Sequence, residues 1–476
     1  MGQEIQAETF CDATRKTFRE RLRQETATLK TWFDDRRFDE DDGPTIGLEL
    51  EGWLVDENGL PSPKNDAFFE AAADPDIVAE LSKFNFELNA PPQRLTGRVF
   101  KQTLADLTRT WTTCCQAAEG LKANAVAIGI LPMVRDEMLQ LPWMSESKRY
   151  RAMNQEVFRH RNDKPLHILI DGRDTLDFEC TNLMLEAACT SLQAHLKVNQ
   201  DDAVRAYNAA VLGAGPLVAA TANSPFLYGR ALWEETRIPT FEQATAIDGF
   251  RDDHGRNVLR VTLGTGYVHE TLLELFVENL SYPDLLPALE DDRRKLPHLR
   301  LQNGTVWRWV RPILGFDDNA SPHLRLEHRV MPAGPTLIDT VANLALCHGL
   351  VLALSKEEIP PESLTPFEDA RSNFYACARH GLKAHINWAG KVLNVQGLLL
   401  EELLPKAHMA LADLGVDAAD LNWLFHEVLD PRIRSGRTGA AWQRAVIASN
   451  QANFQDLTER YIARQQSGAP VHTWSV

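Results

Sequence analysis

The stretch Ile46–Asp56 most constrains how this chain can fold, because it is patterned as a β-strand with two glutamates on one face. Side chains alternate along a strand, so Glu49 and Glu51 point the same way, roughly 6.8 Å apart. Trp53 and Val55 continue this acidic face, which favours a partly sheltered cavity over an ordinary wet surface. The opposite face is apolar and comprises Leu48, Leu50 and Leu54.

The two acids leave two interpretations open. At an effective dielectric near 20, two carboxylates about 5 Å apart repel by roughly 3 kcal/mol, and a bound divalent cation would remove that cost. The alternative is an exposed edge strand with two harmless acids, because acidic side chains are mostly found at the surface. The remainder of the sequence has to decide between a metal site and an edge strand.

Composition indicates an acidic globular protein. The chain has 476 residues, of which 44% are hydrophobic and 24% charged, so it has enough material for a sizeable core. A formal net charge of −16 argues against general binding to nucleic acid or to anionic membranes. We therefore expect neither partner, and a polyphosphate ligand would need local arginines or metal ions. No linker-like segment divides the chain, which favours one large domain with helical appendages.

The seven cysteines indicate reduced thiols, because their number is odd and they show neither a CxxC pair nor zinc-ligand spacing. The N-terminus has no apolar core of the signal-peptide type, and no uninterrupted apolar run reaches membrane-spanning length. These features predict a cytoplasmic protein. The sequence leaves open whether the chain forms a homo-oligomer.

Two later segments also carry polar residues on one strand face. The segment Phe84–Asn89 is predicted to be a strand that Pro91-Pro92 stops, and Glu87 lies on the face opposite Phe84, Phe86 and Leu88. In Ser191–Val198, one face is apolar and the other carries Ser191, Gln193, His195 and Lys197. A third acid and a histidine therefore belong to strands.

The segment His323–Val330 is the third informative strand, because Arg325, Glu327 and Arg329 alternate with apolar residues. One interpretation is a surface ladder of ion pairs, which contributes little stability. The other is a clamp, because guanidinium groups bind phosphate and carboxylate oxygens in a bidentate manner. Such a clamp could hold an anion together with the metal ion that neutralises it.

Other segments are predicted to be packing elements around these strands. Shorter strands are expected at Ala125–Ile130, His167–Asp171 and Asn257–Thr262. Helices are expected at Ile5–Arg37, Thr96–Lys122, Ser145–Arg161, from Asp202 to a helix end at Gly213–Gly215, and over nearly all of the chain from Thr336 onward. The acidic turn Asp39–Pro44 leads into the first strand.

The chain lacks the common phosphate-loop, nucleophile-elbow, zinc-protease and EF-hand motifs. What remains is a set of metal-ligand types on predicted strands, which one sheet could bring together. A lone histidine of this kind is more often structural, but carboxylates with an imidazole suit Mg²⁺ or Mn²⁺, and hard cations indicate a phosphate ligand. The candidate metal ligands are Glu49, Glu51, Glu87, His195 and Glu327.

These segments resemble the glutamate-cysteine ligase family of the second type, the carboxylate-amine ligases, whose catalytic sheet is similar to that of glutamine synthetase. The matching stretches occur in family order from about Thr45 to Gly349 and comprise Gly47–Glu51, Phe86–Pro92, Ser191–Leu196, Asn223–Phe226 and Arg325–Pro332 with Pro335-Thr336. The resemblance implies an α+β fold in which helices surround an open antiparallel sheet. The concave face of that sheet would hold ATP and two or three Mg²⁺ ions.

The resemblance also implies roles for individual residues. Glu51 and Glu87 would hold one Mg²⁺, while Glu49, His195 and Glu327 would hold the ions that bridge the ATP phosphates. Arg325 and Arg329 would stabilise the transferred phosphate, and together with Gln193 they would contact the nucleotide. Residues 1–350, including the charged helix 5–37, would form the catalytic region, and residues 351–476 a helical region packed on the same domain.

The activity that the resemblance implies is ATP-dependent amide formation through an acyl phosphate. The substrates would be small amino acids: the γ-carboxylate of glutamate, with cysteine or another amine as the nucleophile. Two alternatives stay open. One is a metal-dependent phosphohydrolase or kinase that uses the same acids, and the other is a catalytically silent nucleotide-binding scaffold.

Overall fold

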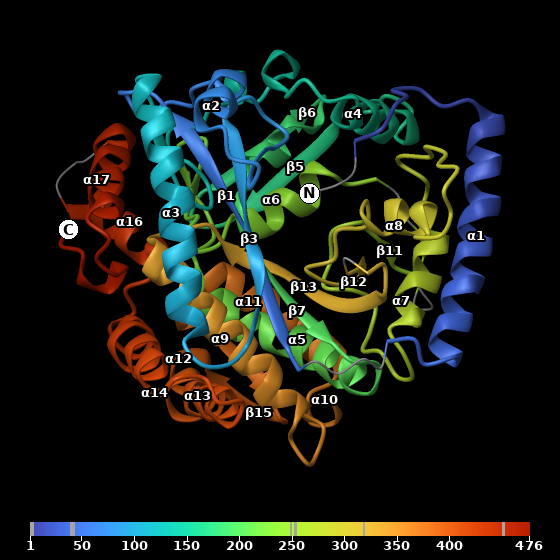
Figure 1. The fold of residues 1–476 in the computed structure, drawn as a ribbon. Coiled ribbons are helices and arrows are strands. Elements are labelled where there is room, and N and C mark those ends of the chain that lie inside the picture. Colours follow the sequence, from blue (N-terminus) through green and yellow to red (C-terminus); the bar gives the residue numbers. More distant parts are fainter. Residues whose placement is uncertain (1–3, 39–42, 248–249, 252–254, 318, 450–452) are drawn as a thin grey trace.

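The computed structural model describes residues 4–38, 43–247, 250–251, 255–317, 319–449 and 453–476. Among these residues, seven strands form one antiparallel sheet in the order β12-β13-β7-β1-β3-β2, with β4 paired to the far end of β1 (Figure 1). The strands are β1 (Thr45–Val55), β2 (Ile77–Ala79), β3 (Asn85–Arg94), β4 (Asn124–Val126), β7 (Ser191–Val198), β12 (Val310–Phe316) and β13 (Pro322–Pro332). The predicted α+β fold with an antiparallel sheet is therefore confirmed.

One face of the sheet is apolar and packs on helices. Its inward side chains are at most 4% exposed and include Leu48, Leu50, Leu88, Leu192 and Leu326. They share a core with α3 (Val99–Gly120), α5 (Gln200–Thr221) and α9 (Leu337–Ser355), and in Figure 1 the last two lie below β7 and β13. The alternation predicted for β1 is confirmed, because all three leucines of its apolar face belong to this core.

The apolar helix α9 is the most hydrophobic element of this core. It is long and apolar enough to cross a membrane, but 78% of its apolar 18-residue stretch is buried inside the protein. Apolar residues on both sides of position 351 join the same core, for example Leu344 of α9 and Leu411 of α13 (Leu404–Asp413). The division of the chain near residue 350 stays a proposal.

Further helices lie around the sheet and beyond the layer formed by α5 and α9 (Figure 1). In chain order they are α1 (Asp12–Asp34), α2 (Asn65–Ala72), α4 (Lys148–His160), α6 (Arg237–Ala244), α7 (Leu273–Glu278), α8 (Pro297–Asn303), α10 (Pro361–Leu364), α11 (Phe367–His380), α12 (Val395–Leu398), α14 (Ala418–Leu421), α15 (Asp430–Ser435), α16 (Gly439–Ser449) and α17 (Phe454–Gln466). Small hairpins pair β5 (Leu166–Asp171) with β6 (Thr175–Cys180), β8 (Phe226–Leu227) with β9 (Arg230–Ala231), and β10 (Phe250–Arg251) with β11 (Asn257–Val258).

Several predicted boundaries were wrong. The N-terminal helix begins at Asp12 instead of Ile5, and the strands expected at Ala125–Ile130 and Asn257–Thr262 are limited to Asn124–Val126 and Asn257–Val258. The C-terminal region also contains a hairpin, β14 (His385–Trp388) with β15 (Lys391–Asn394), whose turn places Ala389 and Gly390 at positive φ. Most of the predicted turn at Asp39–Pro44 lies outside the described residues.

The prolines after Glu87 do not end their strand. Between Leu48 and Ile46 of β1 the partner residues are Ala90 and Gln93 of β3, so β3 carries one extra residue. This bulge accommodates Pro91-Pro92, because a bulge tolerates residues that donate no ladder hydrogen bond. Phe84 was also assigned to the wrong face: it precedes β3 and stacks on Trp53 in a second core, with ring centroids 5.5 Å apart.

The sequence Gly213-Ala-Gly215-Pro216 lies inside α5 instead of at its end. The helix continues because these residues are buried and Gly215 passes within 3.3 Å of the Asn373 backbone, measured from the position of an added Cβ. Close packing of the helices, rather than a break in α5, explains the small residues.

Two helical glycines provide a matched test of this packing. At Gly349 in α9, an added Cβ would lie 2.8 Å from both the Cβ and the carbonyl oxygen of Ala407 in α13, so Gly349→Ala should lower the free energy of unfolding by about 1–3 kcal/mol. At Gly213 the nearest atom would be 3.8 Å away, so Gly213→Ala should raise it by up to about 1 kcal/mol. Urea unfolding measures both, and equal effects would contradict the packing described for α9.

Candidate active site

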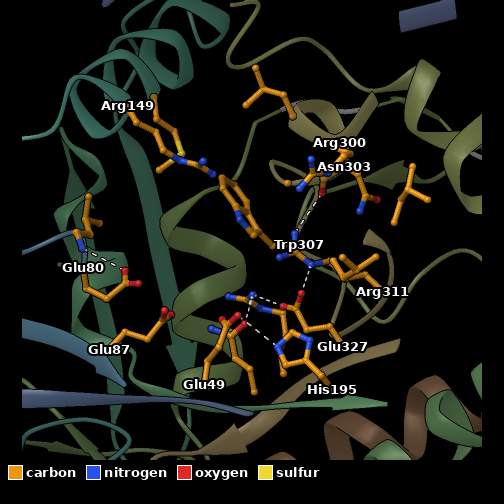
Figure 2. A pocket seen from close by; sticks show the side chains of 18 of the residues that line it. Glu49, Glu80, Glu87, Arg149, His195, Arg300, Asn303, Trp307, Arg311 and Glu327 are labelled. Atoms are coloured by element: carbon orange, nitrogen blue, oxygen red, sulfur yellow. Dashed lines mark hydrogen bonds and ion pairs between the residues drawn. The ribbon is translucent and has the colours of Figure 1, made fainter. Parts of the chain in front are cut away.

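The polar face of the sheet forms part of a cavity of about 340 Å³. All eight predicted site residues line it: Glu49, Glu51, Glu87, Gln193, His195, Arg325, Glu327 and Arg329. Figure 2 shows Glu80 and Glu87 at one side of this cavity and His195 and Glu327 at the other, with Glu49 between them. The expectation that one sheet brings these side chains together is met, whereas their functional roles remain proposals.

Strand register places the side chains, because Glu51 of β1 is directly opposite Glu87 of β3. On the other side of β1, Glu49 is opposite Gln193 of β7, and His195 of β7 is opposite Glu327 of β13. The β1 strand is thus central rather than at an edge. The interpretation of the two β1 acids as harmless edge-strand residues is wrong.

One group of acids is crowded and buried. Oxygen atoms of Glu51, Glu80 and Glu87 all lie within 4.8 Å of one another. Burial and the neighbouring Glu80 raise the pKa of Glu51 to about 7, and burial with Glu49 and Glu80 raises the pKa of Glu87 well above its usual range. Glu51 is fixed in place because its carboxylate accepts hydrogen bonds from Ser191 N, at 2.6 Å, and Ser191 Oγ, at 3.0 Å.

The second group contains acids that are matched by cationic or imidazole partners. Glu327 is 2% exposed and accepts from Arg311 Nε at 2.8 Å and from Arg329 Nη1. Burial alone would raise the pKa of Glu327, but the two arginines outweigh it and lower the pKa to about 2. Nε2 of His195 lies 3.3 Å from Glu49 Oε1, and this contact outweighs burial and holds the pKa of Glu49 well below its usual range.

Arg329 connects the two groups. Its Nη1 donates to Gln193 Oε1 at 2.7 Å as well as to Glu327, and Gln193 Nε2 donates to Glu51 at 3.1 Å. Arg325 also faces the cavity, but Arg311 takes the place expected for it beside Glu327, and among the described residues Arg325 Nε has no hydrogen-bond partner. The surface-ladder interpretation fails because Glu327 is buried.

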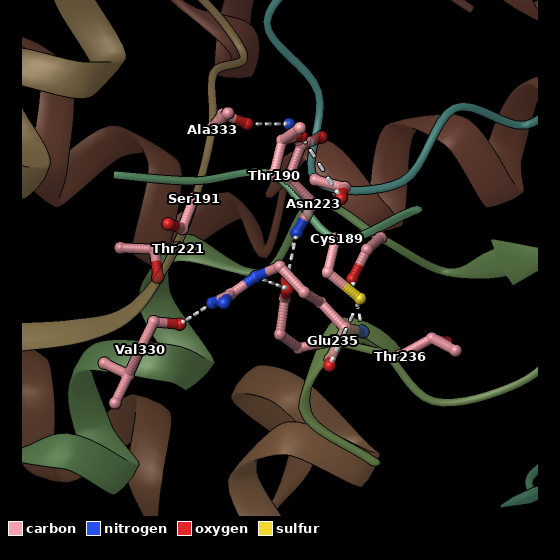
Figure 3. A network of polar contacts seen from close by, with 12 residues as sticks. Cys189, Thr190, Ser191, Thr221, Asn223, Glu235, Thr236, Val330 and Ala333 are labelled. Carbon is pink, nitrogen blue, oxygen red and sulfur yellow. Dashed lines mark hydrogen bonds and ion pairs between the residues drawn. The ribbon is translucent and has the colours of Figure 1, made fainter. Parts of the chain in front are cut away.

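A bulge in β13 orients Arg329. The register of β13 on β7 shifts between His328 and Met331, and the guanidinium of the buried Arg237 donates to the carbonyls of Arg329, at 3.2 Å, and Val330, at 2.5 Å. Glu235 in turn accepts from Arg237 Nε at 3.1 Å and from the Asn223 backbone at 2.8 Å (Figure 3). This network therefore fixes the backbone position of Arg329, whose side chain lines the cavity.

Sequence reasoning missed the residues that line the rest of the cavity. Glu80 follows the three-residue β2, which is too short to show alternation, and Arg311 belongs to β12, which was not predicted. Glu186 lies in a 3₁₀ segment, Leu183–Ala188, and burial together with Glu80 and Glu51 raises its pKa well above the usual range. Further wall residues include Arg149 and Tyr150 of α4, Arg300 and Asn303 of α8, and Trp307.

The donor set fits hard divalent cations. Three carboxylates within 4.8 Å, with raised pKa values at Glu51, Glu80 and Glu87, form a repulsive cluster that a cation would relieve. Oxygen ligands and one imidazole are the types that suit Mg²⁺ and Mn²⁺. Nδ1 of the 7% exposed His195 has no hydrogen-bond partner among the described residues.

The fold is similar to that of two solved ligases. One is a glutamate–cysteine ligase from Francisella tularensis in complex with AMP, with 11% identity, 90% of each chain covered and a TM-score of 0.55. The other is a bifunctional glutathione synthetase from Pasteurella multocida, with 11% identity, 89% of this chain and 52% of that chain covered and a TM-score of 0.56. At such identity the likeness concerns the fold alone.

No curated protein sequence is similar enough to this chain to count as a match. The sequence model described as glutamate-cysteine ligase family 2 (GCS2) matches residues 45–466, which is most of the chain, and it covers every predicted site residue. The chain belongs to glutamate-cysteine ligase family 2.

Proposed function

We propose that this protein is an ATP-dependent carboxylate-amine ligase that forms an amide through an acyl phosphate. The acid is the γ-carboxylate of glutamate, and the nucleophile is cysteine or another amine. The observation that carries the proposal is the presence, in one cavity, of a crowded carboxylate cluster and an arginine-paired carboxylate. Family membership and the AMP bound to the Francisella tularensis relative support it.

The reaction balances in two displacements. A carboxylate oxygen of the acid bonds to the γ-phosphorus of ATP, and ADP leaves. The amine nitrogen then attacks the acyl carbon, inorganic phosphate leaves, and the amine loses a proton. Positioning and electrostatic stabilisation carry most of the catalysis in phosphoryl transfer, so no protein nucleophile is needed. Arg325 and Arg329 would stabilise the transferred phosphoryl group, and Gln193 would orient Arg329 beside it.

Mg²⁺ would be held by the acids of the cavity, and Mn²⁺ would suit the same ligands. Glu51 and Glu87, joined by Glu80, would hold one ion, and Glu49, His195 and Glu327 would hold those at the phosphates. Bound there, the ions would neutralise phosphate charge and act as Lewis acids. Glu327 can serve both arginines and a cation, because a carboxylate offers about four lone-pair directions.

A phosphate-release screen over pairs of acids and amines, followed by mass spectrometry of the product, tests the proposal. Phosphate should appear only when ATP, a divalent cation and both substrates are present, and the product should be an amide. Equal ADP release without any acid would favour the phosphohydrolase alternative. A protein that binds Mg·ATP without ever turning it over would favour the silent scaffold.

The two acid groups should respond in opposite ways to loss of charge. Glu87→Gln removes one member of a repelling cluster, so the ligand-free melting temperature should stay equal or rise, while the stabilisation given by Mg·ATP is largely lost. Glu327→Gln instead removes the partner of two buried arginines, so it should lower the ligand-free melting temperature. Thermal unfolding with and without Mg·ATP measures both. Equal destabilisation of the ligand-free protein by the two variants would contradict the division into a repelling and an arginine-paired group of acids.

Arg329→Lys should slow turnover at least about tenfold, equivalent to roughly 1.4 kcal/mol of transition-state stabilisation, while Mg·ATP binding persists. Lysine keeps the positive charge but cannot form the planar fork that reaches Gln193 and Glu327 together. Steady-state phosphate release and calorimetric titration separate the two effects. Arg294→Lys, at an exposed position paired with Asp292, is the matched control and should leave turnover unchanged.

Cation binding should strengthen as pH rises toward 7. The folded pKa of Glu51, about 7, exceeds its unfolded value near 4.5, so the ligand-free protein binds more protons than the unfolded chain and loses stability across pH 4.5–7. Cations need the ionised carboxylates, so the Mg²⁺-induced increase in melting temperature should be larger at pH 8 than at pH 5.5. Glu51→Gln should weaken this pH dependence, whereas an identical shift at both pH values in the wild type would count against the site.

A further inference from the structure

The N-terminal segment Glu4–Asp34 precedes the family-matched residues 45–466, yet it contacts three walls of the cavity. Its helix α1 buries one face, with Phe18, Leu22, Glu25, Leu29 and Trp32 recurring at helical spacing. In Figure 1, α1 stands at the edge of the molecule beside α7 and α8. Three contacts of this segment reach elements that carry cavity residues.

The first of these elements is α4. Arg15 forms a bidentate ion pair with Glu156, whose side chain is 5% exposed, through N–O distances of 2.7 and 2.5 Å. Met153, one helical turn before Glu156, lines the cavity. Arg149 and Tyr150 at the start of α4 line it as well. The carboxylate of Glu4 accepts from the Arg149 backbone N–H at 3.2 Å, so the segment also fixes the start of α4.

The second element is α8. Glu25, 1% exposed, accepts from Nδ1 of the fully buried His298 at 2.6 Å and from the backbone N–H of Leu299 at 3.0 Å. His298 Nε2 accepts the N–H of Glu290, so its Nδ1 carries the proton donated to Glu25. Arg300, which follows Leu299, lines the cavity, as does Asn303 at the end of the same short helix.

The third contact is aromatic. Trp32, near the end of α1, meets the ring of Phe316 edge-on with centroids 6.2 Å apart, and Phe316 is itself a cavity residue at the end of β12. Arg15 and Glu25 are ten residues apart, which corresponds to about 15 Å along a helix. One rigid element therefore spans the distance between the walls that carry Arg149 and Arg300, which face Trp307 from different sides in Figure 2.

We propose that α1 is a brace that positions the α4 and α8 walls of the active site relative to each other, with Arg15 and Glu25 as positioning residues. The inference rests on the proposed function for the identity of the ligand, but not for the coupling between the walls. Because a brace already restricts the motion of the walls, they lose less conformational entropy when a ligand binds between them. Loosening one end of the brace therefore weakens binding. A helix that only adds stability would not couple one wall to the other.

Hydrogen–deuterium exchange on the full chain without ligand tests the coupling directly. Arg15→Ala cuts the brace at α4, and exchange should rise both in residues 148–160 and in residues 297–303, which Arg15 does not contact. Arg15→Lys keeps one charged hydrogen bond and should show a smaller change in both segments. Lys30→Ala removes an exposed pair with Asp34 on the same helix and should change neither segment. A change confined to α4, or absent from both walls, would overturn the brace.

Calorimetric titration with Mg·ATP supplies the functional readout. Arg15→Ala should raise the dissociation constant about tenfold, while Lys30→Ala leaves it unchanged. If Arg15→Ala alters exchange only at α4 and leaves the dissociation constant at the wild-type value, α1 is a stabilising helix and the inference fails. If the wild type does not bind Mg·ATP but Arg15→Ala loosens both walls, the brace stands and the proposed function fails instead.

Discussion

The mutual repulsion of Glu51, Glu80 and Glu87 is the constraint on which this active site depends. At a separation near 4.8 Å, each ionised pair costs about 3 kcal/mol at an effective dielectric of 20. Burial, with Glu80 beside it, also raises the pKa of Glu51 to about 7, so the ionised form of the cluster is disfavoured. The sheet can maintain such a cluster because its opposite face is apolar and packs against α5 and α9.

The cavity is electrostatically divided. At the end formed by β2 and β3, carboxylates face one another and their pKa values are raised, whereas near β13 the acid Glu327 is matched by Arg311 and Arg329 and its pKa is lowered. The first end is suited to a cation, and at the second end the arginines can donate hydrogen bonds to phosphate oxygens. Gln193 and Arg329 link these ends through hydrogen bonds, so a charge bound at one end affects the other.

Much of the sheet could be predicted from the sequence, because a period of two assigns residues to faces directly. That rule placed Glu49, Glu87, His195 and Glu327 correctly, since each alternates with apolar neighbours on a strand of eight or more residues. It could not reveal strand register, so the exact opposition of Glu51 and Glu87 became visible only in the structure. Pro91-Pro92 misled the prediction because a bulge, which depends on the partner strand, accommodates them.

The missed residues come from elements without that periodicity. Glu80 follows a very short strand, Glu186 lies in a 3₁₀ turn, and Arg149 and Arg300 project from helices whose cavity-facing side depends on tertiary packing. The long N-terminal helix was predicted only as a packing element, because nothing in its sequence indicates that Glu25 is buried against α8. Local patterns thus identified the floor of the cavity, while its walls required the whole fold.

The most direct test of the account is to follow a carboxylate oxygen. Glutamate labelled with ¹⁸O in its γ-carboxylate would be incubated with the enzyme, Mg·ATP and an accepted amine, and the released phosphate would be analysed by mass spectrometry. Formation of an acyl phosphate transfers one labelled oxygen from the acid to each phosphate, together with one amide bond formed. Unlabelled phosphate, with its new oxygen taken from water, would contradict the proposed ligase chemistry.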